Sequence, residues 1–234
     1  MKEDSNKELL KYFIHEVTQL NANIKSHSEL LSKGVNDKMG VLHHSTVINE
    51  CSTVMSVLIE IVSFRLNPNY FKSADRDYRN IHGKFHKSFL SFKRRMKEKS
   101  LTYKLNCDVD CLVKVYPVID TLPYLLIDNA IKYSHKDGHI TTDIFDLGKY
   151  IQIVVENFGP EVYENEHEFI FNKDYRGKNA IIVNPIGNGL GLNIVKSICD
   201  LHNGTVKVLF GNKEYTLNGI NYKSFGIEIT LPKK

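Results

Sequence analysis

The first third of the chain is patterned as two amphipathic helices joined by a turn. Residues 5–32 contain no proline or glycine, and apolar residues recur there at the heptad spacings of 4, 3 and 4, at Phe13, Val17, Leu20 and Ile24. A turn is expected over residues 34–40. A second helix follows, whose apolar stripe consists of Val47, Cys51, Val54, Leu58 and Ile61. We therefore predict a helical hairpin over residues 1–67.

Two helices this apolar cannot bury a wide stripe within a single hairpin. Pairing two copies of the hairpin into a four-helix bundle would cover it. The pattern therefore predicts a homodimer formed through the N-terminal helices.

The pattern changes to short strands and helices after a loosely patterned segment that ends near Asn80, which we interpret as a linker. Phe85, Phe89, Phe92 and Met96 mark an amphipathic helix with a basic outer face. Further helices are predicted at about 122–134, capped by Asp120 or Thr121, and at 190–201. Strands are predicted at 101–107, 140–145, 151–155, 205–210 and 226–231, with a turn at 156–160. The fold class is α+β, with an α/β sandwich of helices on a mainly antiparallel sheet over residues 80–234.

Gly187, Gly189 and Gly191 occupy alternate positions immediately before the helix predicted at 190–201. Glycines let backbone amides approach a ligand, and a helix N-terminus presents free N–H groups and partial positive charge. This arrangement suits a phosphate group. A glycine-rich turn with no ligand is the alternative.

His15, followed by Glu16, lies on the first predicted helix but outside its apolar seam. At about 100° per residue, its side chain points roughly 160° away from Val17, toward solvent or the flank of a bundle. An exposed imidazole can act as a nucleophile while a neighbouring carboxylate takes or orients its proton. The alternative is an ordinary surface histidine in a chain that has 10 of them.

Composition and charge exclude several classes of protein. The net charge is +4, with 42% hydrophobic and 25% charged residues, which gives no case for nucleic acid as the main partner. The four cysteines form no CxxC pair, which predicts free thiols in a reducing compartment. The start of the chain has no signal-peptide core, and the most apolar run, residues 54–64, is short and contains Glu60. We expect a cytoplasmic chain with no membrane span.

Four short motifs in a fixed order resemble the histidine kinases of two-component systems and, more widely, the GHKL ATPases. They are DNAIKYS at 128–134 (the N box), VENFG at 155–159 (the first glycine box), IFNKDYR at 170–176 (the F box) and GNGLGL at 187–192 (the second glycine box). His15 and Glu16 resemble the phosphoacceptor box of the same family. The resemblance runs from about residue 8 to 232 and implies a GHKL (Bergerat-type) α/β sandwich that binds ATP and Mg²⁺.

The resemblance implies a role for each matching residue. Asn129 would ligate Mg²⁺, a hard cation that prefers oxygen ligands. Lys132 and Tyr133 would lie near the phosphates and the nucleotide wall. Asn157 would read the adenine amino group, and Gly159 would let the backbone pass close to the base.

The lid and the second glycine box would hold the phosphates. Arg176, with Lys173, would meet them from a mobile lid formed by residues 178–185. The hinge and cradle would be formed by Gly187, Gly189, Leu190 and Gly191.

The implied reaction transfers the γ-phosphoryl group of ATP to Nε2 of His15, with Glu16 as base or orienting group. The phosphate would then pass to an aspartate on the receiver domain of a response regulator. Some positions depart from the family pattern: Leu125 replaces a polar residue that helps bind the metal, Asn157 replaces the commoner aspartate, and Glu161 replaces a glycine.

Three alternatives to a kinase remain open from the sequence: a phosphotransfer relay protein with weakened ATP chemistry, a GHKL ATPase or regulator in which His15 is not phosphorylated, and a nucleotide-binding module without turnover. We also expect either that the chain is part of a longer receptor or that it takes its signal from a separate sensor protein.

Overall fold

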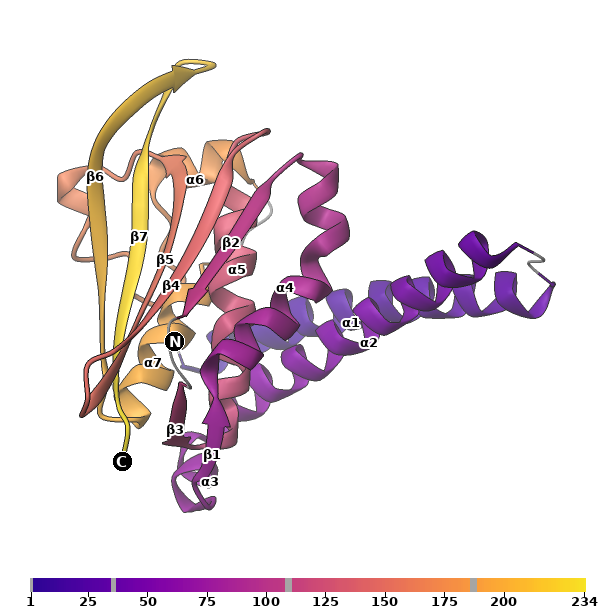
Figure 1. The fold of residues 1–234 in the computed structure, drawn as a ribbon, viewed down its shortest axis with the longest axis horizontal. Coiled ribbons are helices and arrows are strands. Elements are labelled where there is room, and N and C mark those ends of the chain that lie inside the picture. Colours follow the sequence, from indigo (N-terminus) through magenta and orange to yellow (C-terminus); the bar gives the residue numbers. More distant parts are fainter. Residues whose placement is uncertain (1, 35–36, 108–110, 186–188) are drawn as a thin grey trace. The chain divides into compact units, whose positions relative to one another are not determined.

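The computed structural model in Figure 1 divides into two compact units, Met1–Phe71 and Lys72–Lys234. It describes the backbone of residues 2–34, 37–107, 111–185 and 189–234. Side chains are described for the same residues apart from 2–9, 12, 68–70 and 212–214. Each unit is treated separately below.

The first unit is the predicted helical hairpin. Helix α1 spans Lys2–Ser32, helix α2 spans Lys38–Leu66, and the short helix α3 spans Pro68–Ser73. The side chain of Asp37 caps α2 by accepting a hydrogen bond from the backbone N–H of Gly40, with an N···O distance of 2.6 Å. Because of this cap, α2 begins inside the segment predicted as a turn, which therefore ends at Asp37 and not at Gly40.

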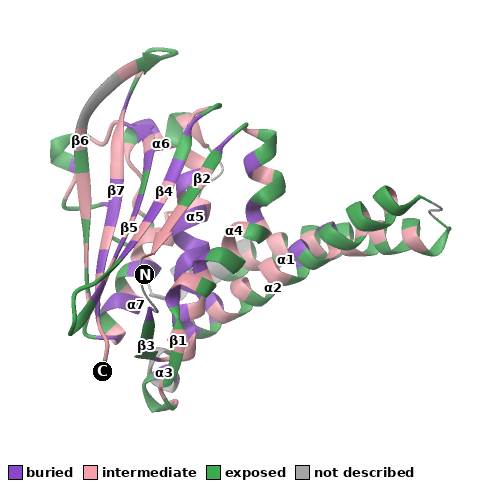
Figure 2. Ribbon diagram, in the orientation of Figure 1, coloured by how far each residue is buried: buried purple, intermediate pink, exposed green. Residues whose placement is uncertain are grey.

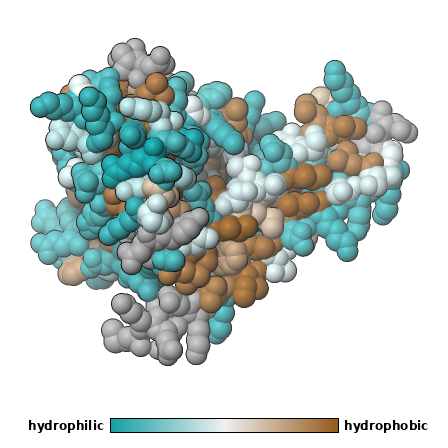
Figure 3. Space-filling model, turned by 90° about the horizontal axis from the view of Figure 1, so that it is seen from below, coloured by the Kyte–Doolittle hydropathy of each residue, from teal (hydrophilic) through white to brown (hydrophobic). Residues whose placement is uncertain are grey.

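The hairpin leaves many apolar side chains exposed. Val47, Cys51 and Ile61 of the predicted stripe are buried, and Val54 and Leu58 are half-buried. The hairpin also has a set of exposed large apolar residues: Leu10, Ile14, Leu30, Met39, Val41, Leu42, Ile59 and Leu66. Figure 3 shows apolar patches along these helices.

Among the described residues, α2 is the one helix long and apolar enough to cross a membrane, with a mean hydropathy of 1.5 over its best window. Helices in the cores of soluble proteins pass the same test. This is therefore weak evidence, and the absence of a span stays a prediction.

The second unit is built on a five-stranded sheet with the order β2-β4-β5-β7-β6. Its strands are β2 (Thr102–Cys107), β4 (His139–Asp146), β5 (Tyr150–Pro160), β6 (Thr205–Leu217) and β7 (Ile220–Pro232). Strands β2 and β4 are parallel, and the other neighbours are antiparallel. A separate two-stranded sheet pairs β1 (Asp77–Asn80) with β3 (Leu112–Val115). The segment interpreted as a linker thus contains α3 and β1.

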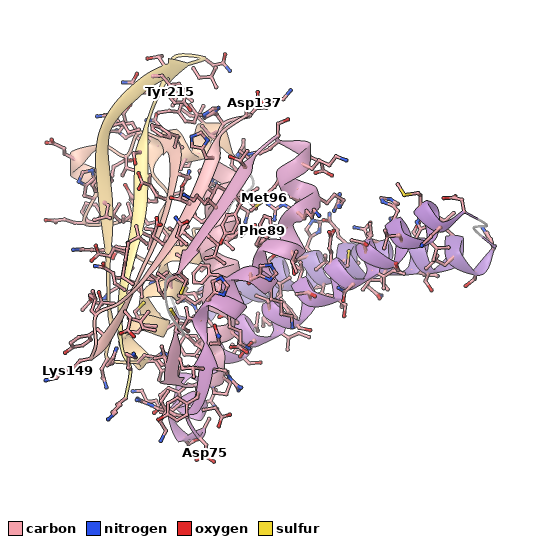
Figure 4. The ribbon with its side chains drawn as sticks, viewed as in Figure 1. Asp75, Phe89, Met96, Asp137, Lys149 and Tyr215 are labelled. Atoms are coloured by element: carbon pink, nitrogen blue, oxygen red, sulfur yellow. The ribbon has the colours of Figure 1, made fainter. Side chains whose placement is uncertain are left out.

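Three helices form the second layer: α4 (Ile81–Glu98), α5 (Leu122–Tyr133) and α7 (Gly191–Leu201). The helices bury apolar faces of the kind the spacing predicts, with Phe85 and Phe92 at most 1% exposed. Phe89 and Met96, labelled in Figure 4, lie on α4, where the Phe89 ring stacks on Tyr103 of β2 at 4.6 Å between centroids. Figure 2 shows buried residues along α5 and the central strands. The predicted α/β sandwich is confirmed.

Several local predictions were wrong. Residues 156–160 continue β5 and do not turn, because β7 pairs with them as far as Pro160 opposite Tyr222. Strands β6 and β7 likewise extend beyond the predicted segments to a turn at Asn218 and Gly219, which both have positive φ. Thr121 occupies the N-cap position of α5, but its hydroxyl donates to the Val118 carbonyl (2.8 Å), since the 3-10 turn η1 (Pro117–Thr121) leads directly into the helix.

None of the four cysteines forms a disulfide in the structure, as predicted. Cys107 is only half-buried, and its sulfur lies 2.7 Å from the sulfur of the buried Cys111. The contact between these two sulfur atoms depends on the folded chain, and the spacing of the two cysteines in the sequence does not predict it.

Candidate functional site: a cleft in the second unit

A cleft of about 970 Å³, a volume that includes space open to solvent, lies within the second unit. Helix α5, the end of β5, the segment after it and the start of α7 form its walls. The lining includes eight of the residues predicted to bind nucleotide: Asn129, Lys132, Tyr133, Asn157, Gly159, Arg176, Gly189 and Gly191.

Helix α5 contributes Asn129, Lys132 and Tyr133 to the cleft because these positions lie on one face of the helix. All three are half-buried. Leu125, one turn before Asn129, also lines the cleft and is 8% exposed. It offers no oxygen, so this face supplies the amide of Asn129 without a second polar ligand one turn earlier.

Asp128 sits at the edge of this wall in a network of charges. Its carboxylate contacts the Lys132 ammonium at 2.5 Å and the Arg95 guanidinium of α4 at 2.8 Å. Burial acts to raise the pKa of Asp128, but Lys132 and Arg95 outweigh it and hold the pKa below its ordinary value. The network fixes Lys132 to the rim of the cleft and ties α5 to α4.

The C-terminal end of α5 is capped by a lysine. Lys99 donates through Nζ to the carbonyl oxygens of Ile131, Lys132 and Ser134 at 2.8, 3.1 and 3.2 Å. A cation at this end complements the partial negative charge of the helix. Burial, together with Arg95, lowers the pKa of Lys99. The wall that carries Asn129 is therefore held in place by groups outside the cleft.

Asn157 faces the cleft with an unmet hydrogen-bonding group. It is 4% exposed, and its Nδ2 is buried without a hydrogen-bond partner among the residues that the structure describes. A Cβ at Gly159 would lie 3.4 Å from this nitrogen and would face the interior of the cleft. An unpartnered buried amide costs roughly 1–3 kcal/mol, so a ligand acceptor placed beside it would relieve a real penalty.

The segment after β5 folds into a lid, and the expected mobile loop at 178–185 instead contains helix α6 (Lys178–Val183). Arg176 organises this helix: its guanidinium donates to the carbonyls of Pro185 (3.1 Å), Ala180 (3.2 Å) and Asn184. The group predicted to meet phosphates thus binds the C-terminal carbonyls of α6 in this structure.

Two buried polar residues that the sequence reading missed fasten the lid. Glu166, 4% exposed, accepts hydrogen bonds from the backbone N–H groups of Tyr163 (3.0 Å) and Lys178 (2.9 Å). Asn179, 7% exposed, donates to the Glu161 carbonyl (2.8 Å). No local motif marks them, because their partners are backbone groups brought together by the fold. A glutamate three residues after Tyr163, as in a capping box, is the only hint.

The second glycine box is described only from Gly189 onward, and Gly187 lies outside the described residues. Gly189 has a φ of +67°, and a Cβ there would lie 2.6 Å from the Tyr175 carbonyl oxygen, so only glycine fits. Gly191 begins α7, and Leu190 is buried at its N-cap position. Neither Leu190 nor the exposed Lys173 is among the residues that line the cleft.

His15 and Glu16 lie in the first unit, on α1. His15 is exposed, as its position outside the seam predicts, and Glu16 is half-buried. The amide Nε2 of Gln19 lies 2.9 Å from Nε2 of His15. With the amide in this orientation its N–H donates to the ring nitrogen, an arrangement that suits the imidazole tautomer protonated on Nδ1.

Residues 123–234 match the family of histidine kinase-, DNA gyrase B- and HSP90-like ATPases. The second unit therefore carries a GHKL-type ATPase domain. Sensor histidine kinase HprS of Escherichia coli (strain K12) is 32% identical over 138 residues, which are 58% of this chain and 27% of HprS. The chain therefore spans about a quarter of the length of that relative. The resemblance to two-component histidine kinases indicated by the four motifs is confirmed.

Solved structures agree with this fold. The mycobacterial sensor histidine kinase MprB superposes with a TM-score of 0.56 and 20% identity over 68% of this chain and 99% of that chain. Histidine kinase ThkA, solved in complex with response regulator protein TrrA, has a TM-score of 0.53 and 19% identity over 97% of this chain and 61% of that chain.

Proposed function

We propose that the protein is an ATP-dependent histidine kinase that phosphorylates itself on His15 and passes the phosphate to an aspartate of a response regulator. The observation that carries the nucleotide half is Asn157. Its amide combines a donor and an acceptor, and the edge of adenine presents a matching pair, an acceptor ring nitrogen beside an amino donor. A buried amide with an unpartnered N–H, facing a cleft that Gly159 keeps open, supports adenine as the base that is bound.

The phosphates lie toward Asn129, Lys132 and the glycines that precede α7. The Lys132 ammonium offsets negative charge at the rim, and its ion pair with Asp128 keeps it there. The Arg176 guanidinium donates hydrogen bonds to three backbone carbonyls at the C-terminal end of α6. If some of these hydrogen bonds broke, the guanidinium could bind phosphate oxygens.

A magnesium ion fits the chemistry of this wall, because Asn129 presents an amide oxygen in the cleft and Mg²⁺ accepts few protein ligands when phosphates and water complete its shell. When bound, the ion neutralises charge on the phosphates. Leu125 leaves Asn129 as the single residue of this face proposed to hold it.

The acceptor half rests on the state of His15. Gln19 donates to Nε2, so this nitrogen carries a lone pair and the tautomer with the proton on Nδ1 is favoured. In the transfer, the Nε2 lone pair forms the N–P bond as the bond between the γ-phosphorus and the bridging oxygen breaks, and ADP leaves with that oxygen. Glu16 takes or orients the proton on Nδ1.

The dimer follows from the exposed apolar residues of the hairpin. Ile14, Met39 and Leu42 are each at least 60% exposed in the single chain, and a partner copy would remove them from water. A second copy buries them in a four-helix bundle. The receiver domain of a response regulator is the proposed acceptor, as the complex of ThkA with TrrA illustrates for that kinase. We place the reaction in the cytoplasm.

Incubation with γ-labelled ATP and Mg²⁺ tests the kinase. We expect a label that is stable in alkali and labile in acid, absent from His15→Gln and unchanged in His139→Gln, an exposed histidine on β4. If wild type binds ATP but takes no label under varied metal and salt conditions, the protein is a nucleotide-binding regulator and His15 is incidental. Label in His15→Gln at the wild-type level would place the acceptor elsewhere. A monomer by light scattering at micromolar concentration would contradict the bundle.

A further inference from the structure

Three histidines converge near the turn of the helical hairpin. His27 lies on α1, and His43 and His44 lie on α2. Their ring centroids are 4.9 to 5.7 Å apart, and one ligand nitrogen from each ring lies within 4.8 Å of the other two. His27 and His44 are half-buried, whereas His43 is exposed. Histidine nitrogens gathered in this way are the commonest protein ligands of late first-row metals.

Two of these rings already share a single proton. Nδ1 of His27 lies 2.8 Å from Nδ1 of His44, so one nitrogen donates and the other accepts. The two nitrogens face each other along one hydrogen bond, so each ring would turn slightly for both lone pairs to meet at one ion. In Zn²⁺ sites the Zn–N distance is about 2.0–2.1 Å, which puts the nitrogens of a tetrahedral site roughly 3.3 Å apart. Rotation of the exposed His43 side chain closes the remaining distance.

The positions of His27 and His44 in the helices give independent support. His27 continues the apolar seam of α1, three residues after Ile24 and four before Leu31, and His44 stands three residues before Val47 in the stripe of α2. Both therefore occupy positions where the pattern calls for an apolar side chain. Polar groups at such positions are costly unless they are satisfied. Their mutual hydrogen bond satisfies one nitrogen of each ring, and a shared ion would replace that bond with two metal–nitrogen bonds.

We propose that His27, His43 and His44 form a binding site for one late first-row divalent metal ion, with Zn²⁺ as the best match. The neutral nitrogen donors favour such an ion over Mg²⁺ or Ca²⁺, which prefer oxygen. Three ligands leave a fourth position for water or another ligand. On binding, the rings ligated through Nδ1 keep their protons on Nε2. The ion would link α1, the helix that also carries His15, to α2. The site does not depend on the proposed kinase activity.

Titration of tag-free, chelator-treated full-length protein with ZnCl₂ in a calorimeter tests the site. We expect one ion bound per chain and a rise in the unfolding temperature with added Zn²⁺. Co²⁺ in place of Zn²⁺ is expected to give the visible absorption of a tetrahedral site. His27→Ala, and separately the double substitution of His43 and His44 by alanine, should weaken Zn²⁺ binding by more than about tenfold. The matched control is His82→Ala with His86→Ala, which removes the stacked pair at i and i+4 on α4.

The proposal would be overturned if the His82→Ala, His86→Ala control lost the bound Zn²⁺ while His27→Ala kept it. It would also be overturned if the wild-type protein bound no Zn²⁺ at micromolar concentration. If circular dichroism shows that His27→Ala does not fold, nuclear magnetic resonance of the histidine side chains in the wild-type protein provides the test. Zn²⁺ must then shift the imidazole nitrogens of three histidines that assign to positions 27, 43 and 44. Shifts confined to other histidines refute the site.

Discussion

Replacing Asn157 by leucine separates what this residue costs the free protein from what it gives to nucleotide binding. Leucine keeps the same number and branching of side-chain heavy atoms but has no polar group. In the free protein the buried Nδ2 finds no partner in the part of the chain that the structure describes. Its desolvation costs roughly 1–3 kcal/mol, so Asn157→Leu should leave the free energy of unfolding unchanged or raise it by up to that amount.

Nucleotide affinity should move in the opposite direction. Two hydrogen bonds to adenine at about 0.5–1.5 kcal/mol each amount to ~1–3 kcal/mol, which is a loss of roughly 5- to 150-fold in ATP affinity. Wild type should also prefer ATP over ITP, which lacks the amino group, and Asn157→Leu should lose that preference. Denaturant unfolding of the nucleotide-free protein and calorimetric titration with each nucleotide measure the two effects.

Asn179→Leu is the matched control, because Asn179 is also a buried asparagine but its Nδ2 donates to the Glu161 carbonyl at 2.8 Å. It should lower the free energy of unfolding by about 1–3 kcal/mol, since the half-buried Glu161 carbonyl loses its partner. If Asn157→Leu destabilises the free protein as much as Asn179→Leu and leaves ATP affinity unchanged, Asn157 is a structural residue and the assignment of the adenine site is wrong.

Three further predictions concern the rest of the second unit. Gly189→Ala should lower the free energy of unfolding by about 2–4 kcal/mol, because the backbone there is left-handed and the new Cβ would lie 2.6 Å from a carbonyl oxygen. Gly191→Ala should be nearly neutral, because no atom of the described residues lies within 4 Å of a Cβ at that position, and equal losses in the two variants would contradict the assigned packing. Burial lowers the pKa of His202, which hydrogen-bonds Ile198 and Tyr116 through its two ring nitrogens, so the unfolded state takes up the proton first. Stability should therefore fall as the pH drops through about 6.5, with a shallower fall in His202→Gln than in His139→Gln, as followed by denaturant unfolding at several pH values. The pKa of Asp128 is lowered, so its contribution to the free energy of unfolding is present above the ordinary carboxyl pKa near 3.9 and is lost as the pH falls through the pKa of the folded state. Asp128→Asn should therefore make the loss of stability at acid pH less steep. An unchanged acid pH dependence would show that the pairing of Asp128 with Arg95 and Lys132 stabilises the fold little.

The lid shows how a correct motif can carry an unexpected local role. Arg176 lies in the predicted box and lines the cleft, yet its hydrogen bonds go to the carbonyl end of α6. If nucleotide binding broke these hydrogen bonds, binding of the phosphates would change how firmly helix α6 is held. Glu166 and Asn179 hold the other end of the same segment through hydrogen bonds to backbone groups.

Sequence by itself determined the features that depend on near neighbours along the chain. The apolar spacing of α2, α4 and α7 set which faces are buried, and the i, i+3 spacing of Asn129 and Lys132 put both on the cleft face of α5. His15 could be placed outside the seam because helical periodicity alone fixes that direction. The order of the four motifs indicated the nucleotide-binding fold for the same reason, since each motif is a local segment.

Tertiary structure decided what depends on partners far away in sequence. Residues 156–160 look like a turn because Asn, Gly and Pro disfavour strands, but pairing with β7, more than 60 residues later, extends β5 through them. That pairing is also what buries Asn157 with an unpartnered amide. The histidine cluster required the packing register of two helices, which brings His27 and His44 together across 17 residues. Local pattern sets which face of an element is apolar, and only the packed chain sets which polar groups on those faces meet.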